Sequence, residues 1–266
     1  MTAPIFEVRD VTYRYHEVTA LDGLNLAIMP GQRVVLLGAN GSGKSTLLSI
    51  LDGLCFPEEG SVFFQGEPLT ENGLNGQTEF DFRRRVGLVF QNPDVQLFNP
   101  SVFDEVAFGP LQLQWPKEQI RLRVSAMLEQ MEIAHLKDRS PHHLSTGEKK
   151  RVALASVLIL DPEVLLLDEP TAALDPRSES QMIDFLVGCS GGRKTVITAT
   201  HDLDLVEDIA DCCHVFQRGR IVAAGTPAEI MNDQPLLLST NLVHAHRHSH
   251  SSSELHSHPH RHGHGH

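Results

Sequence analysis

The chain has 266 residues, of which 41% are hydrophobic and 21% are charged, and its formal net charge is −12 with histidine neutral. This composition supports a globular core and excludes a collagen-like, disordered or disulfide-stapled chain. The acidic excess argues against a nucleic-acid partner, because phosphate backbones are themselves negative. The four cysteines lack regular spacing, so we interpret them as buried apolar residues in a reducing compartment.

Membrane insertion is not expected from the sequence either. The first ten residues carry charges and lack the apolar core of a signal peptide. The longest apolar stretch, Val152 to Leu160, is far shorter than the roughly 20 residues that cross a bilayer. We therefore predict a soluble or peripheral protein without a transmembrane segment.

The first part of the chain has the pattern of strands and turns. Apolar residues at helical spacing predict a helix over Lys44 to Leu54, and the polar segment Leu69 to Gln77 is predicted as a surface loop. Alternating or continuous apolar runs predict strands over Phe6 to Tyr15, Leu24 to Met29, Arg33 to Leu37, Ser61 to Gln65 and Val86 to Gln91.

From Asn92 the pattern changes to helix, most clearly over Lys117 to Ile133. Alternation of strand and helix then resumes, so that the whole pattern predicts an α/β sheet with a helical subdomain. The later segments are predicted as a helix, a strand, a helix, a strand, a short helix and a hairpin, over Ser145 to Leu160, Val164 to Asp168, Arg177 to Cys189, Thr195 to Thr200, Asp202 to Ile209 and Cys213 to Ala224.

A phosphate-binding loop is the most specific motif. The segment Gly38-Ala-Asn-Gly-Ser-Gly-Lys-Ser45 fits G-x-x-x-x-G-K-[ST] and stands between a predicted strand and a predicted helix. Glycines let backbone N–H groups surround phosphate oxygens, while the lysine reaches the β- and γ-phosphates and the serine offers its hydroxyl to Mg²⁺. The predicted nucleotide contacts are Gly38, Asn40, Gly41, Ser42, Gly43, Lys44, Ser45 and Thr46.

Two carboxylates follow the buried strand that ends at Asp168. Beside a phosphate loop, Asp168 is expected to hold the Mg²⁺ shell, and Glu169 to orient or deprotonate the attacking water. His201 follows the next predicted strand, at the sheet edge where open α/β folds bind ligands, and is expected to contact the γ-phosphate. A structural histidine is the alternative.

The segment Leu144-Ser-Thr-Gly-Glu148 opens a predicted helix. Ser145 and Glu148 have the S-x-x-E spacing of a capping box. The same helix N-terminus, with Ser145 and Gly147, is also suited to bind a second phosphate. Both interpretations can hold together.

The order of these motifs resembles that of the ABC transporter ATPases over nearly all of residues 5–228. The resemblance rests on the phosphate loop, Gln91, LSTGE, LLLDEP, Ala173-Leu174-Asp175 and His201. It implies a P-loop NTPase core with an N-terminal antiparallel β-subdomain and a helical subdomain. It also implies that ATP lies between the phosphate loop of one subunit and Ser145 and Gly147 of its partner.

Further roles come only from this resemblance. Gln91 would link the Mg²⁺ site to the helical subdomain and take part in catalysis, and Asp175 would lie at the dimer seam. Tyr15 would stack on adenine, with an ordinary strand tyrosine as the alternative. Thr146 and Glu148 depart from the common LSGGQ signature, so we expect weakened but real signature function.

Within the family, Gln91-Asn-Pro-Asp-Val-Gln-Leu-Phe98 and Asp104-Glu-Val-Ala-Phe-Gly109 resemble the energy-coupling-factor importer ATPases, especially the cobalt and nickel branch. Val95 replaces the usual second acid of the first stretch. The predicted protein is a homodimeric ATPase with ATP and Mg²⁺, bound to a transmembrane coupling subunit and a metal-binding membrane subunit at the cytoplasmic face of the membrane. A vitamin importer of the same group is one alternative; a DNA-repair or chromosome-maintenance ATPase is disfavoured, because no long heptad run precedes Ser145.

The predicted organisation is a nucleotide-binding core (1–91 and 151–228), a helical subdomain (92–150), a C-terminal helix (229–243) and a tail (244–266) that is disordered without metal. Ten of the 16 histidines lie in this tail. Imidazoles bind Ni²⁺ and Co²⁺, so a metal buffer is one interpretation, with an adventitious binder or a tag as the alternatives. The candidate tail ligands are His246, His248, His250, His258, His260, His262, His264 and His266.

Overall fold

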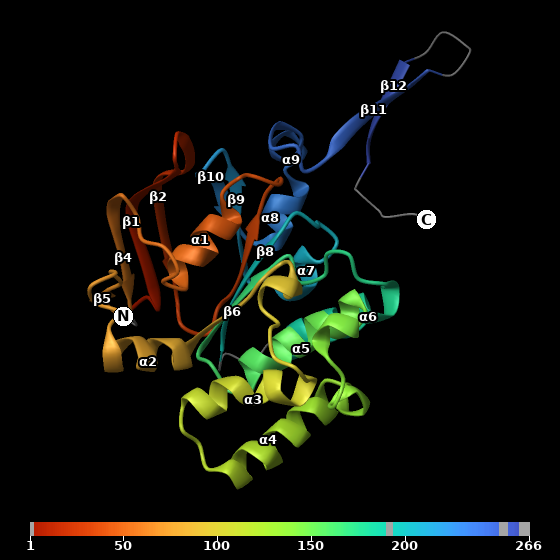
Figure 1. Ribbon diagram of the computed structural model, residues 1–266. Coiled ribbons are helices and arrows are strands. Elements are labelled where there is room, and N and C mark those ends of the chain that lie inside the picture. Colours follow the sequence, from red (N-terminus) through yellow and green to blue (C-terminus); the bar gives the residue numbers. More distant parts are fainter. Residues whose placement is uncertain (1–2, 190–193, 250–254, 261–266) are drawn as a thin grey trace.

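The computed structural model describes residues 3–189, 194–249 and 255–260, and its N-terminal part is a four-stranded antiparallel sheet (Figure 1). The strand order is β2-β1-β4-β5. Alternating burial along the two long strands places one face of the sheet on the core, as expected for an antiparallel sheet with one solvated face. The bounds are β1 (Phe6–Tyr15), β2 (Val18–Ile28), β4 (Glu59–Phe64) and β5 (Glu67–Pro68).

The second sheet has six strands in the order β10-β9-β3-β8-β7-β6 and is parallel except at β10. Its central strands β3, β7 and β8 are almost wholly buried, which is why their sequences are continuous apolar runs. The bounds are β3 (Arg33–Leu37), β6 (Val86–Val89), β7 (Val164–Asp168), β8 (Thr195–Thr200), β9 (Cys212–Gln217) and β10 (Arg220–Gly225).

Helix α1 (Lys44–Leu51) lies between the two sheets, and its residues Leu47, Leu48 and Leu51 are fully buried there. The opposite face of the six-stranded sheet is covered by the remaining core, to which α3 to α7, α8 (Pro227–Asn232) and α9 (Gln234–Ser239) contribute. The bounds on this side are α3 (Val102–Gln112), α4 (Lys117–Gln130), α5 (Thr146–Leu158), α6 (Pro176–Gly188) and α7 (Val206–Ile209), with short 3-10 turns η1 (Pro93–Val95), η2 (Ala134–Leu136) and η3 (Pro141–His143).

The α/β class, the antiparallel N-terminal sheet and the helical subdomain agree with the sequence prediction. Helices α3, α4 and the start of α5 form the subdomain, below the sheets in Figure 1. Their shared core includes Val106, Val124 and Val152, none of which is exposed to solvent.

Two helical segments differ from the prediction. Helix α2 (Gly76–Arg85) begins inside the segment predicted as a loop; it is polar over most of its surface and is held by Phe82, which is buried, and by Arg83, which bonds to Asp52. The predicted single C-terminal helix is two helices, α8 (Pro227–Asn232) and α9 (Gln234–Ser239). Asp233 separates them, because its carboxylate caps α9 at the N–H of Leu236.

The tail was predicted to be disordered, whereas the structure pairs two of its segments as an antiparallel hairpin. Strand β11 (His244–Ser249) faces β12 (Leu255–His260) in a continuous register, projecting from the body beyond α9 (Figure 1). Backbone pairing needs no apolar side chains, which is why composition alone did not reveal it. His250, His262, His264 and His266 lie outside the described residues.

None of the helices within the described ranges is long and apolar enough to cross a membrane.

Candidate functional site

The phosphate loop leaves β3 at Leu37 and enters α1 at Lys44, as its sequence predicts. The Lys44 ammonium donates to the carbonyl oxygens of Gly38 at 2.6 Å and Ala39 at 3.3 Å. Its side chain is buried, and burial lowers the pKa of Lys44, while the carboxylates of Glu169 and Asp168 oppose that shift. A buried ammonium bonded mainly to carbonyls of its own loop can turn to an anion placed in that loop.

Two glycines let the phosphate loop pack closely against neighbouring segments of the chain. A Cβ at Gly38 would lie 2.7 Å from both the Phe216 carbonyl oxygen and the Ser42 Oγ, and one at Gly43 would lie 2.6 Å from the Ala20 carbonyl oxygen. Gly43 also has a φ of +112°, which disfavours any side chain. The buried Ser42 Oγ has no hydrogen-bond partner within the described part of the chain. The unpartnered Ser42 hydroxyl is a donor that would suit a bound phosphate.

Three strand ends bring the remaining predicted residues to this loop. Gly38 N donates to the Thr200 carbonyl oxygen at 3.2 Å, and Asp168 is in register with Ala199 on β8. The Ser45 hydroxyl donates to Asp168 Oδ1 at 3.0 Å. Burial raises the pKa of Asp168, and this bond from Ser45 partly offsets the shift. A hydroxyl beside a carboxylate is an oxygen donor set that suits Mg²⁺.

Glu169 lies at the centre of a buried polar group. Its Oε1 is 2.9 Å from His201 Nδ1 and 3.7 Å from Lys44 Nζ, and Thr200 Oγ1 donates to its Oε2 at 3.4 Å. The Glu169 side chain is only 5% exposed, whereas that of His201 is 38% exposed. A carboxylate so enclosed, with a histidine open to solvent beside it, can accept a proton from a water molecule at the loop.

The signature segment forms the predicted capping box at the start of α5. Glu148 N bonds to Ser145 Oγ at 3.4 Å, and the Glu148 carboxylate accepts both the Ser145 N–H and the Ser145 hydroxyl at 2.8 Å. These bonds lower the pKa of Glu148, the backbone bond most strongly. Both donors that Ser145 could offer to a phosphate are therefore taken by its own chain.

Gly147 packs against α6, so its lack of a side chain has a structural reason. A Cβ there would lie 2.6 Å from Ser178 Oγ. Asp175 caps α6 by accepting the N–H groups of Arg177 and Ser178 at 3.1 Å. No hydrogen bond in the described ranges joins Ser145 or Gly147 to the phosphate loop of the same chain.

Two residues predicted to bind nucleotide or Mg²⁺ form no hydrogen bond with the group of Lys44, Asp168 and Glu169 at the phosphate loop. Gln91 follows β6 and is exposed, and its side chain makes no hydrogen bond to the described part of the chain. Tyr15 is 49% exposed at the end of β1, where its ring meets that of Tyr13 edge-on at 5.0 Å between centroids. An exposed aromatic ring can receive a base, but nothing in the fold distinguishes this role from that of an ordinary strand tyrosine.

One residue beside this site, Lys150, is not predicted from the sequence. Lys150 of α5 is 3% exposed and contacts the loop that follows β7. Residue type carries no signal for this position, because Lys149, Lys150 and Arg151 form a charged run at the start of the helix and only the fold shows that Lys150 is the buried one.

Comparison with known proteins identifies the class. The family model for ABC transporters matches residues 21–172, which is more than half of the chain. The chain therefore belongs to the ABC transporter family of ATP-binding proteins, and it is an ATPase, in agreement with the loop, the carboxylates and the signature.

Individual relatives show which branch of the family this chain resembles. The chain is 55% identical over 244 residues to the nickel import ATP-binding protein NikO of Rhodobacter capsulatus, covering 90% of this chain and 96% of the relative. It is 43% identical to the energy-coupling factor transporter ATP-binding protein EcfA of Methanocaldococcus jannaschii, covering 90% and 85%. The predicted resemblance to the energy-coupling-factor and metal-importer branch is thus confirmed.

Solved structures of ATP-binding cassettes have the same fold as this chain. The chain superposes with a TM-score of 0.76 on cbiO1 from Clostridium perfringens, a part of the ABC transporter complex cbiONQ, at 39% identity with coverage of 90% and 95%. A dimeric ATP-binding cassette in a post-hydrolysis state with ADP and Pi matches with a TM-score of 0.73 at 27% identity, with coverage of 84% and 98%.

Proposed function

We propose that this chain is the ATP-hydrolysing subunit of an energy-coupling-factor ABC importer for nickel or cobalt ions. The observation that carries the proposal is the 55% identity to a nickel import ATP-binding protein over nearly the full length of both chains. A vitamin importer of the same group is the alternative. A DNA-repair or chromosome-maintenance ATPase is not favoured, because the longest helix between the phosphate loop and Ser145 in the described ranges, α4, has 14 residues and no coiled-coil length.

In this proposal the nucleotide phosphates lie along the loop from Gly38 to Thr46, and Lys44 exchanges its loop carbonyls for phosphate oxygens. Ser45 and Asp168, with Gln91 brought in from its exposed position, would hold Mg²⁺, which offsets the phosphate charge. Glu169 takes a proton from the attacking water, and His201 contacts the γ-phosphate. The bond from Ser45 to Asp168 and the contact of Glu169 with His201 support these roles.

The proposed active form is a homodimer in which Ser145 and Gly147 of one subunit meet the nucleotide of the other, with Asp175 at the seam. The dimeric ADP-bound neighbour supports this arrangement. The capping box adds a condition: Glu148 must release the Ser145 hydroxyl before that group binds phosphate. Such competition is the physical basis for expecting a weakened signature.

A groove between α2 and α3 is the proposed binding site for a membrane coupling subunit. That subunit would hold the ATPase at the cytoplasmic face of the membrane. The groove has a volume of 440 Å³, and Phe80, Phe108, Arg83 and Arg84 contribute apolar and basic side chains to it. Phe98, which is 62% exposed, packs edge-on against Phe108 at its border. This surface suits an apolar helix with acidic flanks, carried by a partner that spans the membrane.

The histidine-rich tail is the proposed Ni²⁺ or Co²⁺ buffer. In the hairpin, His246 is in register with His258 and His244 with His260. Among the residues whose side chains are described, no group of three or more His, Cys, Asp or Glu could hold a metal ion. Binding is therefore expected in the tail, and it should fade below about pH 6.5 as imidazoles are protonated.

The decisive experiment combines isolation of the native complex with transport. Membranes from native cells, captured through this chain, should yield a coupling subunit and a metal-binding membrane subunit, and loss of the chain should abolish uptake of radiolabelled Ni²⁺ or Co²⁺. Capture with a vitamin-binding membrane subunit and normal metal uptake would select the alternative. Isolation without any membrane protein would refute the importer assignment.

The tail is tested separately by deleting residues 244–266. Calorimetry with Ni²⁺ and with Co²⁺ should show loss of most micromolar binding, while ATP affinity stays unchanged. Undiminished metal binding would place the site in the folded body. Lost binding with unaltered cellular uptake and regulation would leave the tail an adventitious binder.

A further inference from the structure

Lys150 is a buried lysine whose ammonium bonds to three backbone carbonyl groups. Its Nζ donates to the carbonyl oxygens of Glu169 at 2.9 Å, Pro170 at 3.1 Å and Ala172 at 2.7 Å. An ammonium has three N–H donors, so these three bonds satisfy it completely. Burial lowers the pKa of Lys150 to about 8, against the opposing charges of Glu169 and Asp168. Burying an ammonium group is unfavourable, so its three N–H groups must all find hydrogen-bond acceptors in the fold.

The loop that Lys150 holds is the one that carries the proposed catalytic base. Glu169 has a φ of +45° and Ala173 a φ of +59°, both in the left-handed region that disfavours residues with a side chain. Such a conformation persists only when neighbouring contacts fix it. Three carbonyl groups of this short loop converge on one ammonium, so the position of Nζ fixes the path of the backbone on which the Glu169 carboxylate is mounted.

Lys150 also lies on the helix that begins at the signature. Helix α5 starts at Thr146, directly after Ser145, and Lys150 is one turn further along. Lys150 therefore joins α5, the signature helix, to the loop of residues 169–175 in the same chain. We call this loop the hydrolytic loop. A displacement of the start of α5 would reach Glu169 through a single side chain.

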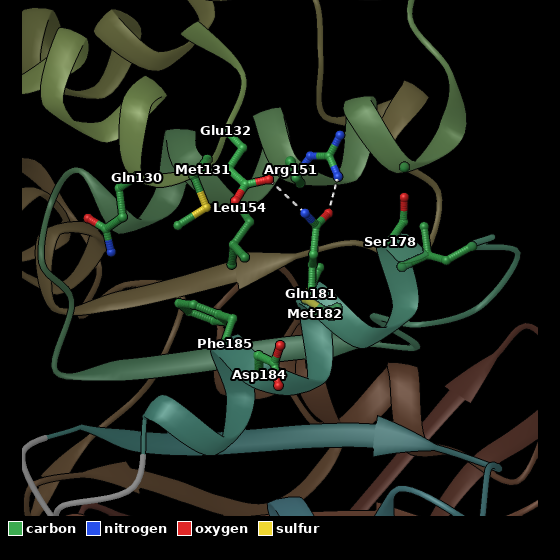
Figure 2. A pocket seen from close by; sticks show the side chains of 12 residues that line it. Gln130, Met131, Glu132, Arg151, Leu154, Ser178, Gln181, Met182, Asp184 and Phe185 are labelled. Carbon is green, nitrogen blue, oxygen red and sulfur yellow. Dashed lines mark hydrogen bonds between the residues drawn. The ribbon is translucent and has the colours of Figure 1, made fainter. Parts of the chain in front are cut away.

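Helix α5 also contacts α6 and the segment after α4 through side-chain hydrogen bonds. Arg151 Nη1 donates to Gln181 Oε1 at 2.6 Å, and Gln181 Nε2 donates to Glu132 Oε2 at 2.7 Å, which links α5 and α6 to the end of α4 (Figure 2). These bonds border a cavity of 330 Å³ lined by apolar side chains such as Leu154 and Phe185. These bonds join side chains of α5, α6 and the segment after α4, whereas Lys150 bonds directly to the backbone of the hydrolytic loop.

We infer that Lys150 is a positioning residue for ATP hydrolysis, which holds Glu169 in its productive place and makes that place depend on the signature helix. The inference rests on the ATPase activity of the family and is independent of the transported cargo. It separates two steps: nucleotide binding belongs to the phosphate loop, which Lys150 does not touch, and only hydrolysis depends on Lys150.

The test is Lys150→Met, with Lys149→Met as the matched control. Lys149 is the preceding residue of α5, but its ammonium bonds to Asp94 at 2.6 Å and leaves the hydrolytic loop untouched. At saturating ATP, kcat of Lys150→Met should fall by about 10- to 100-fold, the range that a small misplacement of a catalytic group produces, while the Kd for ATP stays unchanged. Lys149→Met should keep the wild-type kcat.

A structural readout accompanies the rates. Without nucleotide, hydrogen exchange in the segment 169–175 should be faster in Lys150→Met than in the wild type and unchanged in Lys149→Met. If Lys150→Met does not fold, Lys150→Gln replaces it, because its amide retains two N–H donors and should give a smaller fall in kcat.

A folded Lys150 variant with wild-type kcat and wild-type exchange would overturn the inference. Equal losses in the Lys149 and Lys150 variants would do the same. A wild-type chain that fails to hydrolyse ATP would instead refute the ATPase assignment, so the two failures are distinguishable.

Discussion

Replacement of Glu169 by Gln tests the role of the carboxylate at the centre of the site. The amide has the same shape, can still accept the hydrogen bond from Thr200 at 3.4 Å, and leaves Lys44 bonded to the Gly38 carbonyl oxygen at 2.6 Å. The change therefore removes basicity and one negative charge 3.7 Å from Lys44, but no packing. Because the lysine keeps its loop contacts, we expect nucleotide-free thermal stability close to that of the wild type.

The expected kinetic effect follows from the loss of a general base. Such groups contribute about 10²- to 10⁴-fold to the rate, which corresponds to about 3–5 kcal/mol of transition-state stabilisation. ATP binding should persist, since neither Lys44 nor the backbone donors of the loop are altered. The ATP-bound dimer should then accumulate, because its exit by hydrolysis is blocked.

Three measurements decide this prediction: phosphate release at saturating ATP, titration with a fluorescent nucleotide, and light scattering of the chain with ATP. Glu163→Gln is a matched control, because Glu163 precedes the same strand β7 at its other end and pairs with Arg85 at 2.9 Å. Phosphate release at the wild-type rate in Glu169→Gln would remove Glu169 from its proposed role.

Three further predictions concern single sites. Lys44→Ala should abolish tight ATP binding, because the phosphates lose the ammonium charge at the loop; unchanged affinity in a nucleotide titration would refute the assignment of the phosphate loop. Burial raises the pKa of Asp52 from 3.8 to about 7, even though Arg83 opposes the shift. The folded state therefore binds this proton more tightly than the unfolded state does. The free energy of unfolding should fall by up to about 4 kcal/mol as the pH rises from about 4 to 7. Asp52→Asn should flatten that fall in denaturant unfolding, and a variant that loses more stability at pH 7.5 than at pH 5 would show that the ion pair with Arg83 dominates instead. Gly147→Ala should lower the melting temperature, because its Cβ would lie 2.6 Å from Ser178 Oγ, and adding Ser178→Gly should restore it; failure of this rescue would show that packing against Ser178 is not the reason for the glycine.

The sequence by itself determined the parts of this protein that depend on short spacing. The phosphate loop between β3 and α1 follows from glycines, a lysine and a serine at fixed offsets, because backbone donors must surround a phosphate within a few residues. The capping box of Ser145 and Glu148 is equally local and is confirmed by the hydrogen bonds at the start of α5. Continuous apolar runs predicted the buried parallel strands, since both of their faces are covered.

Tertiary structure alone decided the features that depend on contacts distant in sequence. Helix α2 is mostly polar, so periodicity does not reveal it; it is held by Phe82 in the core and by Arg83 at Asp52. Lys150 looks like a solvated lysine in a charged helix start, and only the fold brings it to three carbonyl groups beyond β7. Hydrogen bonds to main-chain carbonyls leave no mark in residue type, so their partners can be found only when the backbone path is known.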